Sequence, residues 1–379
     1  MGFVAPAGDS EHNNIDFPFG LNEFADHEQV CLGRDPESGF TGFVAIHSTA
    51  LGPALGGCRM VPYASGADAY RDALRLSQAM SYKNALAGLP HGGGKAVIWA
   101  DPATQKTPAL LTAMGRFIAT LQGRYITAGD VGISVADLDV IGAVNPWTTG
   151  RSPQRGGAGD SGILTAFGVW QGMRAAATYR WGSDDLSGRL IGIEGVGKVG
   201  RRLSVHLVSE AGARVVVTDP SAEAIAQLQD QVDVSVVSSR DELLAMPLDV
   251  YSPNALGRVL TADVVATMSA TIVCGGANNQ VAGHDVPTML AAREVLYAPD
   301  FLVNCGGVVQ VADEVIGFDF HRARARVAQV YDTALAVFAR ADRDGISPLA
   351  AATQEAQDRI AAGSQPRFAS STQSAVPRE

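Results

Sequence analysis

The segment "LIGIEGVGKVGRRL", residues 190–203, decides the fold of the second half of the chain. It places Gly195, Gly197 and Gly200 in the pattern GxGxxG, directly after an apolar run and at the start of a helix-like stretch. A second apolar run, "RVVVTD", follows and ends at Asp219. A strand, a glycine turn, a helix and a strand that ends in an acid together indicate a dinucleotide-binding unit.

Each part of this unit has a separate physical role. The glycines permit a tight turn, a close approach of the backbone to a pyrophosphate and the packing of helix on strand, while helix N-terminal amides face the phosphates. Asp219 would accept hydrogen bonds from the adenosine ribose and repel a 2′-phosphate, which predicts NAD as cofactor and not NADP. The alternative is a glycine-rich turn without a ligand. The predicted cofactor-binding residues here are Gly195, Val196, Gly197, Lys198, Val199, Gly200 and Asp219.

Apolar runs continue to alternate with helix-like stretches beyond this unit, in "DVSVV", "LDVYSP", "TIVCGGA" and "VLYAPDFLVN". This alternation predicts a parallel, doubly wound, Rossmann-like sheet. The preceding segment "TTGRSPQRGGAGDSG" is rich in Gly and Ser and is typical of a hinge. We therefore predict a cofactor-binding domain over residues 151–344 and a substrate-binding domain over 1–150 with about 345–365. Residues 366–379 are polar and aperiodic, which predicts disorder.

The first third of the chain has a different pattern, which predicts an α/β domain with a mixed sheet. Two strand-like runs around the turn residues "DPESG" indicate a hairpin over residues 29–49. Helical spacing follows at about 66–88 and 108–122, with a strand over 95–100 between them. The short run "RYITAGD" then indicates a strand ending in a turn that carries Asp130.

Composition limits the classes of partner and the compartment. A net charge of −10 and a pI near 5.2 argue against nucleic acid or an anionic membrane as partner. The four cysteines are far apart without a CxxC pair, so neither a disulfide framework nor a metal site is expected. The first residues lack the pattern of a secretory signal, and no long apolar span is present, which predicts a cytoplasmic protein.

The stretch "YKNALAGLPHGGGKAVIWAD", residues 82–101, places two lysines around three glycines. It is not a phosphate loop, because Leu89 stands where that motif needs glycine and Ala96 stands where it needs Ser or Thr. We instead predict that the first domain contributes Lys83, Lys95 and Asp130 to a cleft between the domains. The glycines, residues 92–94, are expected to let a substrate approach Lys95 without steric competition.

With these blocks the chain resembles the family of glutamate, leucine, phenylalanine and valine dehydrogenases. The resemblance runs over about residues 29–355 and is closest to the bacterial valine (branched-chain) members, above all in "GRSPQRGGAGDSGILTAFGV". It is carried by "LGPALGGCRM", "MSYKNALAGLPHGGGKAVI", "GRYITAGDVG", "GIEGVGKVG", "GGANNQVA" and "YAPDFLVNCGGVVQVADE".

The resemblance implies NAD-dependent, reversible oxidative deamination of an L-amino acid to a 2-oxo acid and ammonia. It implies that Lys83 binds the substrate carboxylate, that Lys95 is the general acid and base that activates water, and that Asp130 handles protons at the substrate nitrogen. Desolvation in a closed cleft and the charge of Lys83 would both help Lys95 to release its proton. The resemblance also implies that the protein forms a homo-oligomer. Its other partners would be small molecules only, namely the amino acid, the 2-oxo acid and ammonia.

Further residues follow from the resemblance alone. Asn278 is expected to contact the nicotinamide or the substrate amine, and Asn279 to share that role. The other expected cofactor neighbours are Arg59, Ser161, Thr165, Asn254 and Ala255.

The expected side-chain pocket consists of Leu55, Gly56, Ala128, Val308 and Val311. This small aliphatic set predicts branched-chain substrates, with valine favoured over leucine and isoleucine. Gly129 departs from the family, in which Glu or Cys often precedes the aspartate, and could widen the pocket. One alternative is therefore an aromatic substrate, phenylalanine or tryptophan. Another is a catalytically inactive, NAD-binding regulatory relative, which the joint presence of Lys83, Lys95 and Asp130 disfavours.

Overall fold

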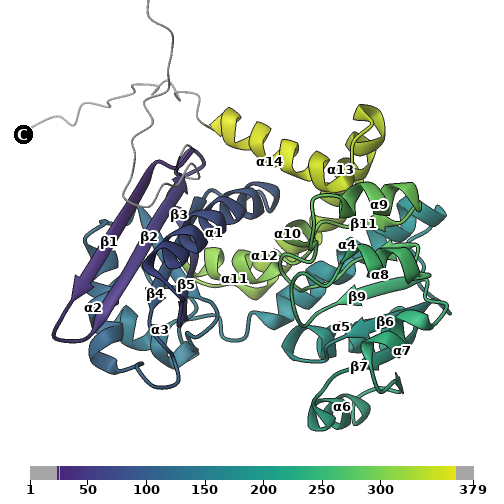
Figure 1. Cartoon of the computed structure of the whole chain (residues 1–379), viewed down its shortest axis with the longest axis horizontal. Coiled ribbons are helices and arrows are strands. Elements are labelled where there is room, and N and C mark those ends of the chain that lie inside the picture. The colour runs from purple at the N-terminus through teal and green to yellow at the C-terminus, as the bar shows by residue number, and fades with distance from the viewer. Residues whose placement is uncertain (1–23, 25, 364–379) are drawn as a thin grey trace, which may run out of the picture.

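The computed structural model describes residue 24 and residues 26–363, which form two α/β domains side by side (Figure 1). Strands β1 to β5 belong to the first domain and strands β6 to β11 to the second. The predicted disordered tail, residues 366–379, lies outside the described residues, as does the N-terminal segment in which no secretory signal is predicted.

The first domain contains a mixed five-stranded sheet, as predicted. Its order is β1-β2-β4-β3-β5, and β1 and β2 form the expected antiparallel hairpin. Strand β4 runs antiparallel to β2, whereas β3 runs parallel to both β4 and β5. The bounds are Gln29–Asp35 for β1, Phe40–Ser48 for β2, Ala54–Val61 for β3, Gly92–Trp99 for β4 and Tyr125–Gly129 for β5.

Helices cover both faces of this sheet. Helix α1, Gly66–Leu86, begins where the Ser65 side chain accepts a hydrogen bond from the backbone N–H of Asp68, and it packs on one face. Helices α2, Pro108–Ala119, and α3, Val135–Gly142, pack on the other. The sheet is thus the middle layer of three, and its edge strand β5, which pairs with β3, lies on the side of the second domain (Figure 1).

The second domain is a parallel six-stranded sheet in the order β11-β10-β9-β6-β7-β8. In chain order this is the doubly wound arrangement 3-2-1-4-5-6, with its switch point between β6 and β9, where ligands of such folds bind. Its strands are β6 Leu190–Glu194, β7 Arg214–Thr218, β8 Ser235–Val236, β9 Val250–Pro253, β10 Ile272–Val273 and β11 Leu296–Tyr297. Its connecting helices are α5 Lys198–Ser209, α6 Ala222–Gln229, α7 Arg240–Ala245, α8 Ala262–Thr267 and α9 Val286–Ala292.

The last predicted strand is wrong over most of its length. The run "VLYAPDFLVN" forms only the two-residue strand β11 and then helix α10, Asp300–Val303. Pro299 separates the two elements, and proline has no N–H to donate to a sheet ladder. The residues beyond it are therefore free to begin a helix that faces the first domain.

Long helices connect the two domains. Helix α4, Gly162–Trp181, follows the predicted hinge, which the half-buried carboxylate of Glu314 holds by accepting the N–H groups of Gly150 and Ala158 at 2.8 and 2.9 Å. The remaining helices are α11 Gly306–Glu314, α12 Phe320–Ala328, α13 Val330–Asp344 and α14 Pro348–Gly363. Helix α14 returns to the first domain, where Arg359 donates to the carbonyl oxygens of Ala85 and Leu86 in α1 at 3.1 Å each.

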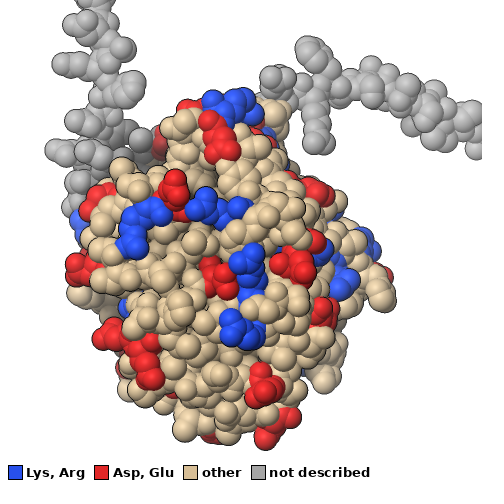
Figure 2. All heavy atoms as spheres, turned by 90° about the vertical axis from the view of Figure 1, so that its right-hand side faces the viewer, with Lys and Arg blue, Asp and Glu red and all other residues tan. Residues whose placement is uncertain are grey.

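Two surface properties bear on partners. Figure 2 shows acidic and basic side chains mixed over the face of the second domain, without a large field of one sign on that face. Among residues 24 and 26–363, the helices are all too short or too polar to cross a bilayer.

Candidate active site

A cavity of about 780 Å³ lies between the domains. The first domain lines it with residues of β3, β4, β5, α1 and α3, and the second domain with residues of α4, α5, α10 and α11. It therefore lies between the glycine motif and the lysine-bearing elements, where the sequence places the cleft.

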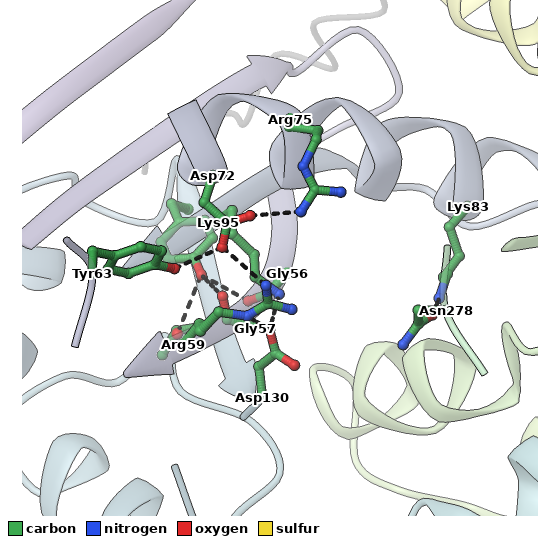
Figure 3. A network of polar contacts seen from close by, with 12 residues as sticks. Gly56, Gly57, Arg59, Tyr63, Asp72, Arg75, Lys83, Lys95, Asp130 and Asn278 are labelled. Atoms are coloured by element: carbon green, nitrogen blue, oxygen red, sulfur yellow. Dashed lines mark hydrogen bonds and ion pairs between the residues drawn. The ribbon is translucent and has the colours of Figure 1, made fainter. Parts of the chain in front are cut away.

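Lys95 and Asp130 meet in this cavity. Lys95 lies in the middle of β4 and is 5 % exposed, and its Nζ is 2.5 Å from Oδ2 of Asp130, which follows β5 directly. Arg59 of β3 contacts the same carboxylate oxygen through Nε at 2.9 Å (Figure 3). Burial opposes ionisation of Asp130, but Lys95 and Arg59 outweigh it and hold the pKa of this carboxyl far below its usual range. Asp130 is therefore an anion shared by two cations.

The glycines before Lys95 do not serve the substrate, so that prediction was wrong. They lie inside β4, and a Cβ on Gly92 would stand 1.8 Å from the carbonyl oxygen of Ser48. A Cβ on Gly93 would stand 2.1 Å from the backbone nitrogen of Ser81 in α1. The run thus allows α1 and β2 to approach β4 closely, and this packing fixes the position of Lys95.

Lys83 faces this pair from the last turn of α1. Its Nζ donates to Oδ1 of Asn278 in the second domain at 3.1 Å (Figure 3). Asn304 donates to the same oxygen at 2.9 Å. Burial lowers the pKa of Lys83, although the nearby Asp300 opposes this, and burial likewise raises the pKa of Asp300 against the effect of Lys83. The structure thus brings Lys83 and Asn278 together, as predicted for one site.

Asp300 and Asn304 are site residues that the sequence analysis missed. Both line the cavity, yet they lie in the run that was taken for a strand. Asp300 begins helix α10 and Asn304 ends it, four residues later. Two polar residues at helical spacing in an otherwise apolar run were the signal that could have found them.

Four of the five predicted pocket residues line the cavity, namely Gly56, Ala128, Val308 and Val311. Leu55 is the exception and is fully buried in the core with Ala85 and Leu86 of α1. Successive residues of a strand point to opposite faces, so Leu55 and Gly56 do not face one pocket together. The apolar side chains that the sequence analysis missed are Leu76, Ala79, Met80, Ile133, Val135, Ala136, Leu138 and Phe301.

Gly129 opens less space than its lack of a side chain suggested. A Cβ there would meet Cδ1 of Leu138 at 3.3 Å and the carbonyl oxygen of Ile133 at 3.7 Å. The position is therefore directed at α3 and its preceding turn, and Leu138 occupies the room beside it.

The glycine motif fits a dinucleotide. Gly195 has φ of +92°, and a Cβ on Gly200 would lie 1.9 Å from the carbonyl oxygen of Gly195, so the turn itself needs both residues. A Cβ on Gly197 would meet nothing within 4 Å, because the space before the N-terminus of α5 is open. Asp219 lies beside this turn, where its Oδ2 accepts from the N–H of Val196 at 2.8 Å. An open cradle of amides with an acid beside it is what a pyrophosphate and its ribose require.

The remaining predicted cofactor neighbours fall into two groups. The first lines the cavity and consists of Arg59, Ser161, Thr165, Lys198, Val199, Asn278 and Asn279. Asn254 and Ala255 instead pack behind the turn: Oδ1 of Asn254 accepts from the N–H of Gly276 at 2.8 Å, and Cβ of Ala255 would be 2.6 Å from a Cβ on Gly195.

Comparisons with known proteins agree with this architecture. The sequence model of the "Glu/Leu/Phe/Val dehydrogenase, dimerisation domain" matches residues 27–144, and that of the "Glutamate/Leucine/Phenylalanine/Valine dehydrogenase" family matches residues 217–362. The chain is 56% identical over 337 residues to valine dehydrogenase of Streptomyces albus, covering 88% of this chain and 92% of that protein. It is 43% identical over 342 residues to leucine dehydrogenase of Geobacillus stearothermophilus, covering 90% and 93%.

The fold also matches solved structures. L-tryptophan dehydrogenase from Nostoc punctiforme superposes with a TM-score of 0.80 at 37% identity, covering 90% of this chain and 97% of the other. The doubly wound domain with its glycine turn faces two lysines and a carboxylate across a cleft, and the relatives are amino-acid dehydrogenases, so the protein is a two-domain amino-acid dehydrogenase, an oxidoreductase. The chain belongs to the Glu/Leu/Phe/Val dehydrogenase family.

Proposed function

We propose that the protein oxidises branched-chain L-amino acids, with valine favoured, to 2-oxo acids and ammonia, with NAD as the hydride acceptor. The observation that carries this proposal is the meeting of Lys95 and Asp130 at 2.5 Å in a cavity that also holds Lys83. The identities to valine and leucine dehydrogenases support the substrate class. Because these relatives are named as dehydrogenases, an inactive regulatory protein is the weaker candidate.

The residues of the chain divide the work. Lys83 binds the substrate carboxylate. Oδ1 of Asn278 accepts a hydrogen bond from the Lys83 ammonium and thereby orients it, and Asn304 holds Asn278 by donating to the same oxygen. Asp130 faces the substrate nitrogen as an acceptor, because its low pKa keeps it ionised. Lys95, released from its own proton, takes one from the attacking water and returns it as the nitrogen leaves. Bound NAD would supply the acceptor for the hydride that leaves Cα.

The cofactor would be held by the open turn of Gly195, Val196, Gly197, Lys198, Val199 and Gly200. Asp219 carries the choice between NAD and NADP, since its carboxylate lies beside the turn and would repel a 2′-phosphate. Ser161, Thr165 and Asn279 line the cavity and would be neighbours of the bound cofactor.

Replacing Asp219 with Ser should weaken NAD binding and relax the discrimination against NADP, because the substitution removes the repelling carboxylate. The measurement is kcat/KM for both cofactors at saturating valine. Asp230→Ser, a change on the outer end of α6, is the matched control and should keep the ratio of the parent. An unchanged NAD to NADP ratio in Asp219→Ser would mean that another residue reads the ribose.

The substrate class rests on the apolar wall of Ala128, Val308 and Val311, which Leu138 extends. No basic side chain stands at this wall among the described residues that line the cavity, where the cations are Arg59, Lys83, Lys95 and Lys198. Arg59 and Lys95 are paired with Asp130, and Lys83 is reserved for the substrate carboxylate. A second carboxylate, as in glutamate, would therefore be buried without a partner.

Steady-state NADH formation with a panel of L-amino acids at alkaline pH tests the proposed function. We expect overlapping activity on valine, isoleucine, leucine and 2-aminobutyrate, because an apolar pocket discriminates by only about 1 to 3 kcal/mol per methylene. Glutamate should give no measurable rate. A higher kcat/KM for phenylalanine or tryptophan than for every branched-chain substrate would replace the pocket assignment with the aromatic alternative.

Three further features belong to this proposal. The match of residues 27–144 to a dimerisation domain supports a homo-oligomer. The four cysteines, all free, support the reducing cytoplasm as compartment. The contacts of Arg359 with α1 support the assignment of the C-terminal helix to the substrate-binding domain.

A further inference from the structure

The contacts of Arg59 extend beyond the active-site cavity. Its Nε contacts Oδ2 of Asp130 at 2.9 Å, while its Nη1 contacts Oδ2 of Asp72 in α1 at the same distance. Tyr63 donates to that oxygen of Asp72 at 2.6 Å, and Arg75 binds the other oxygen at 2.6 Å (Figure 3). The Arg59 guanidinium is thus held from both sides, with 21 % of its side chain exposed.

A single carboxylate oxygen is the link between this network and Lys95. Oδ2 of Asp130 receives both Lys95 at 2.5 Å and Arg59 at 2.9 Å. A lysine that had this carboxylate to itself would hold its proton tightly, because an opposite charge at such a distance favours the charged form. A second cation on the same oxygen weakens that hold, both by sharing the anion and by repelling the ammonium.

We propose that Asp72 and Tyr63 are positioning residues that hold Arg59 against Asp130, and that this sharing of Asp130 sets the pH at which Lys95 can release its proton for catalysis. The proposal rests on the proposed function, because it assigns Lys95 the role of base. The proposal goes beyond that function because it assigns a role to Arg59, Asp72 and Tyr63. These residues act through Asp130 on Lys95 and do not contact the substrate.

The surroundings of Lys95 leave room for this control. The charged and titratable groups that face it are Asp130 after β5, Arg59 and the buried thiol of Cys58 in β3, and Lys83 in α1. Burial raises the pKa of Cys58 to about 12, so this thiol stays neutral over the range in which the enzyme would be assayed. Lys83 is held by Asn278 across the cleft, which leaves Arg59 as the cation that shares the oxygen of Asp130 with Lys95.

The central test is the pH profile of kcat/KM for L-valine in Arg59→Met. Loss of the shared cation should move the acidic limb to higher pH by about one unit, which is a tenfold lower rate at a fixed pH on that limb. Arg59→Lys keeps the charge and should restore most of the position of the limb. The KM for valine should change much less than kcat/KM in the region of the limb. A lower rate with an unmoved limb would leave Arg59 with a structural role and overturn the proposal.

Asp72→Asn separates a relayed effect from a direct one. Removing an anion near Lys95 would by itself move the acidic limb to lower pH, whereas loosening Arg59 moves it to higher pH. The proposal predicts the second direction in Asp72→Asn and, to a smaller extent, in Tyr63→Phe. Arg71→Met is the matched control, since this arginine of α1 pairs with Asp68 at 3.2 Å and should leave the limb unchanged within error. A limb that moves to lower pH in Asp72→Asn would contradict the relay.

A second readout does not depend on turnover. The rate at which trinitrobenzenesulfonate modifies Lys95, measured by mass spectrometry of the digested protein, reports the unprotonated fraction of this amine at each pH. Its midpoint should rise in Arg59→Met and in Asp72→Asn, but not in Arg71→Met. If the parent forms no NADH with any amino acid, the proposed function fails, and the labelling still decides whether Arg59 controls Lys95. Identical labelling curves in all four proteins would overturn the proposal.

Discussion

Lys95→Ala should lower kcat for valine oxidation by at least about 10²-fold, the lower end of what a general acid and base contributes. The loss should fall on kcat more than on KM, because the carboxylate contact of Lys83 with the substrate remains. NADH affinity, measured by fluorescence titration, should stay close to that of the parent, since the glycine motif lies in the other domain.

The matched control is Lys106→Ala. Lys106 forms a comparable pair with Asp137 at 2.8 Å in the same domain, but it does not line the cavity. Lys106→Ala should therefore show a loss of stability like that of Lys95→Ala, but it should keep the turnover of the parent. Lys95→Met, which nearly preserves the volume of the side chain, separates chemistry from a packing defect. Activity of Lys95→Met within a few fold of the parent would remove Lys95 from the chemistry.

Asp130→Asn should cost about 10²-fold or more in kcat, and it should also lower the stability of the protein. The amide keeps the shape but cannot accept protons at the substrate nitrogen as an anion. It also leaves Lys95 and Arg59 facing each other in a buried site without the charge that both of them bind. Steady-state kinetics and thermal unfolding at the same pH measure the two losses.

Asp137→Asn provides the comparison for Asp130→Asn, since it breaks the Lys106 pair and a cap of α3. It should lower the unfolding temperature with little change in kcat. Should the two variants lose stability to a similar degree and both remain active, Asp130 would hold the fold together without handling protons.

Local patterns in the sequence predicted much of this site. The Rossmann-like unit of strand, glycine turn, helix and strand could be predicted because its parts and Asp219 follow one another along the chain. The cleft residues Lys83, Lys95 and Asp130 were also predicted to meet, and the cavity contains all three. This meeting could be predicted because the order of helices and strands along the chain indicates which of their ends lie at the cleft.

The errors concern relations between distant elements. The glycine run before Lys95 looked like access for a substrate, yet its neighbours are Ser48 and Ser81, which no local pattern connects to it. Leu55 was placed in the pocket together with Gly56, although successive residues of a strand point to opposite faces. This error could have been avoided from the sequence alone. The ion pairs of Arg59 with Asp72 and Asp130 join residues 13 and 71 positions apart, and such spacings carry no signal in one sequence.

The most direct test of the account is to follow L-valine that carries deuterium on Cα through the reaction with NAD. We expect one deuterium on each NADH formed, with one ammonia and one 2-oxo acid released per NADH. We also expect this product to be lost in Lys95→Met. NADH that carries no deuterium, or no NADH with any branched-chain amino acid, would contradict hydride transfer from the substrate in the cleft of Lys83, Lys95 and Asp130.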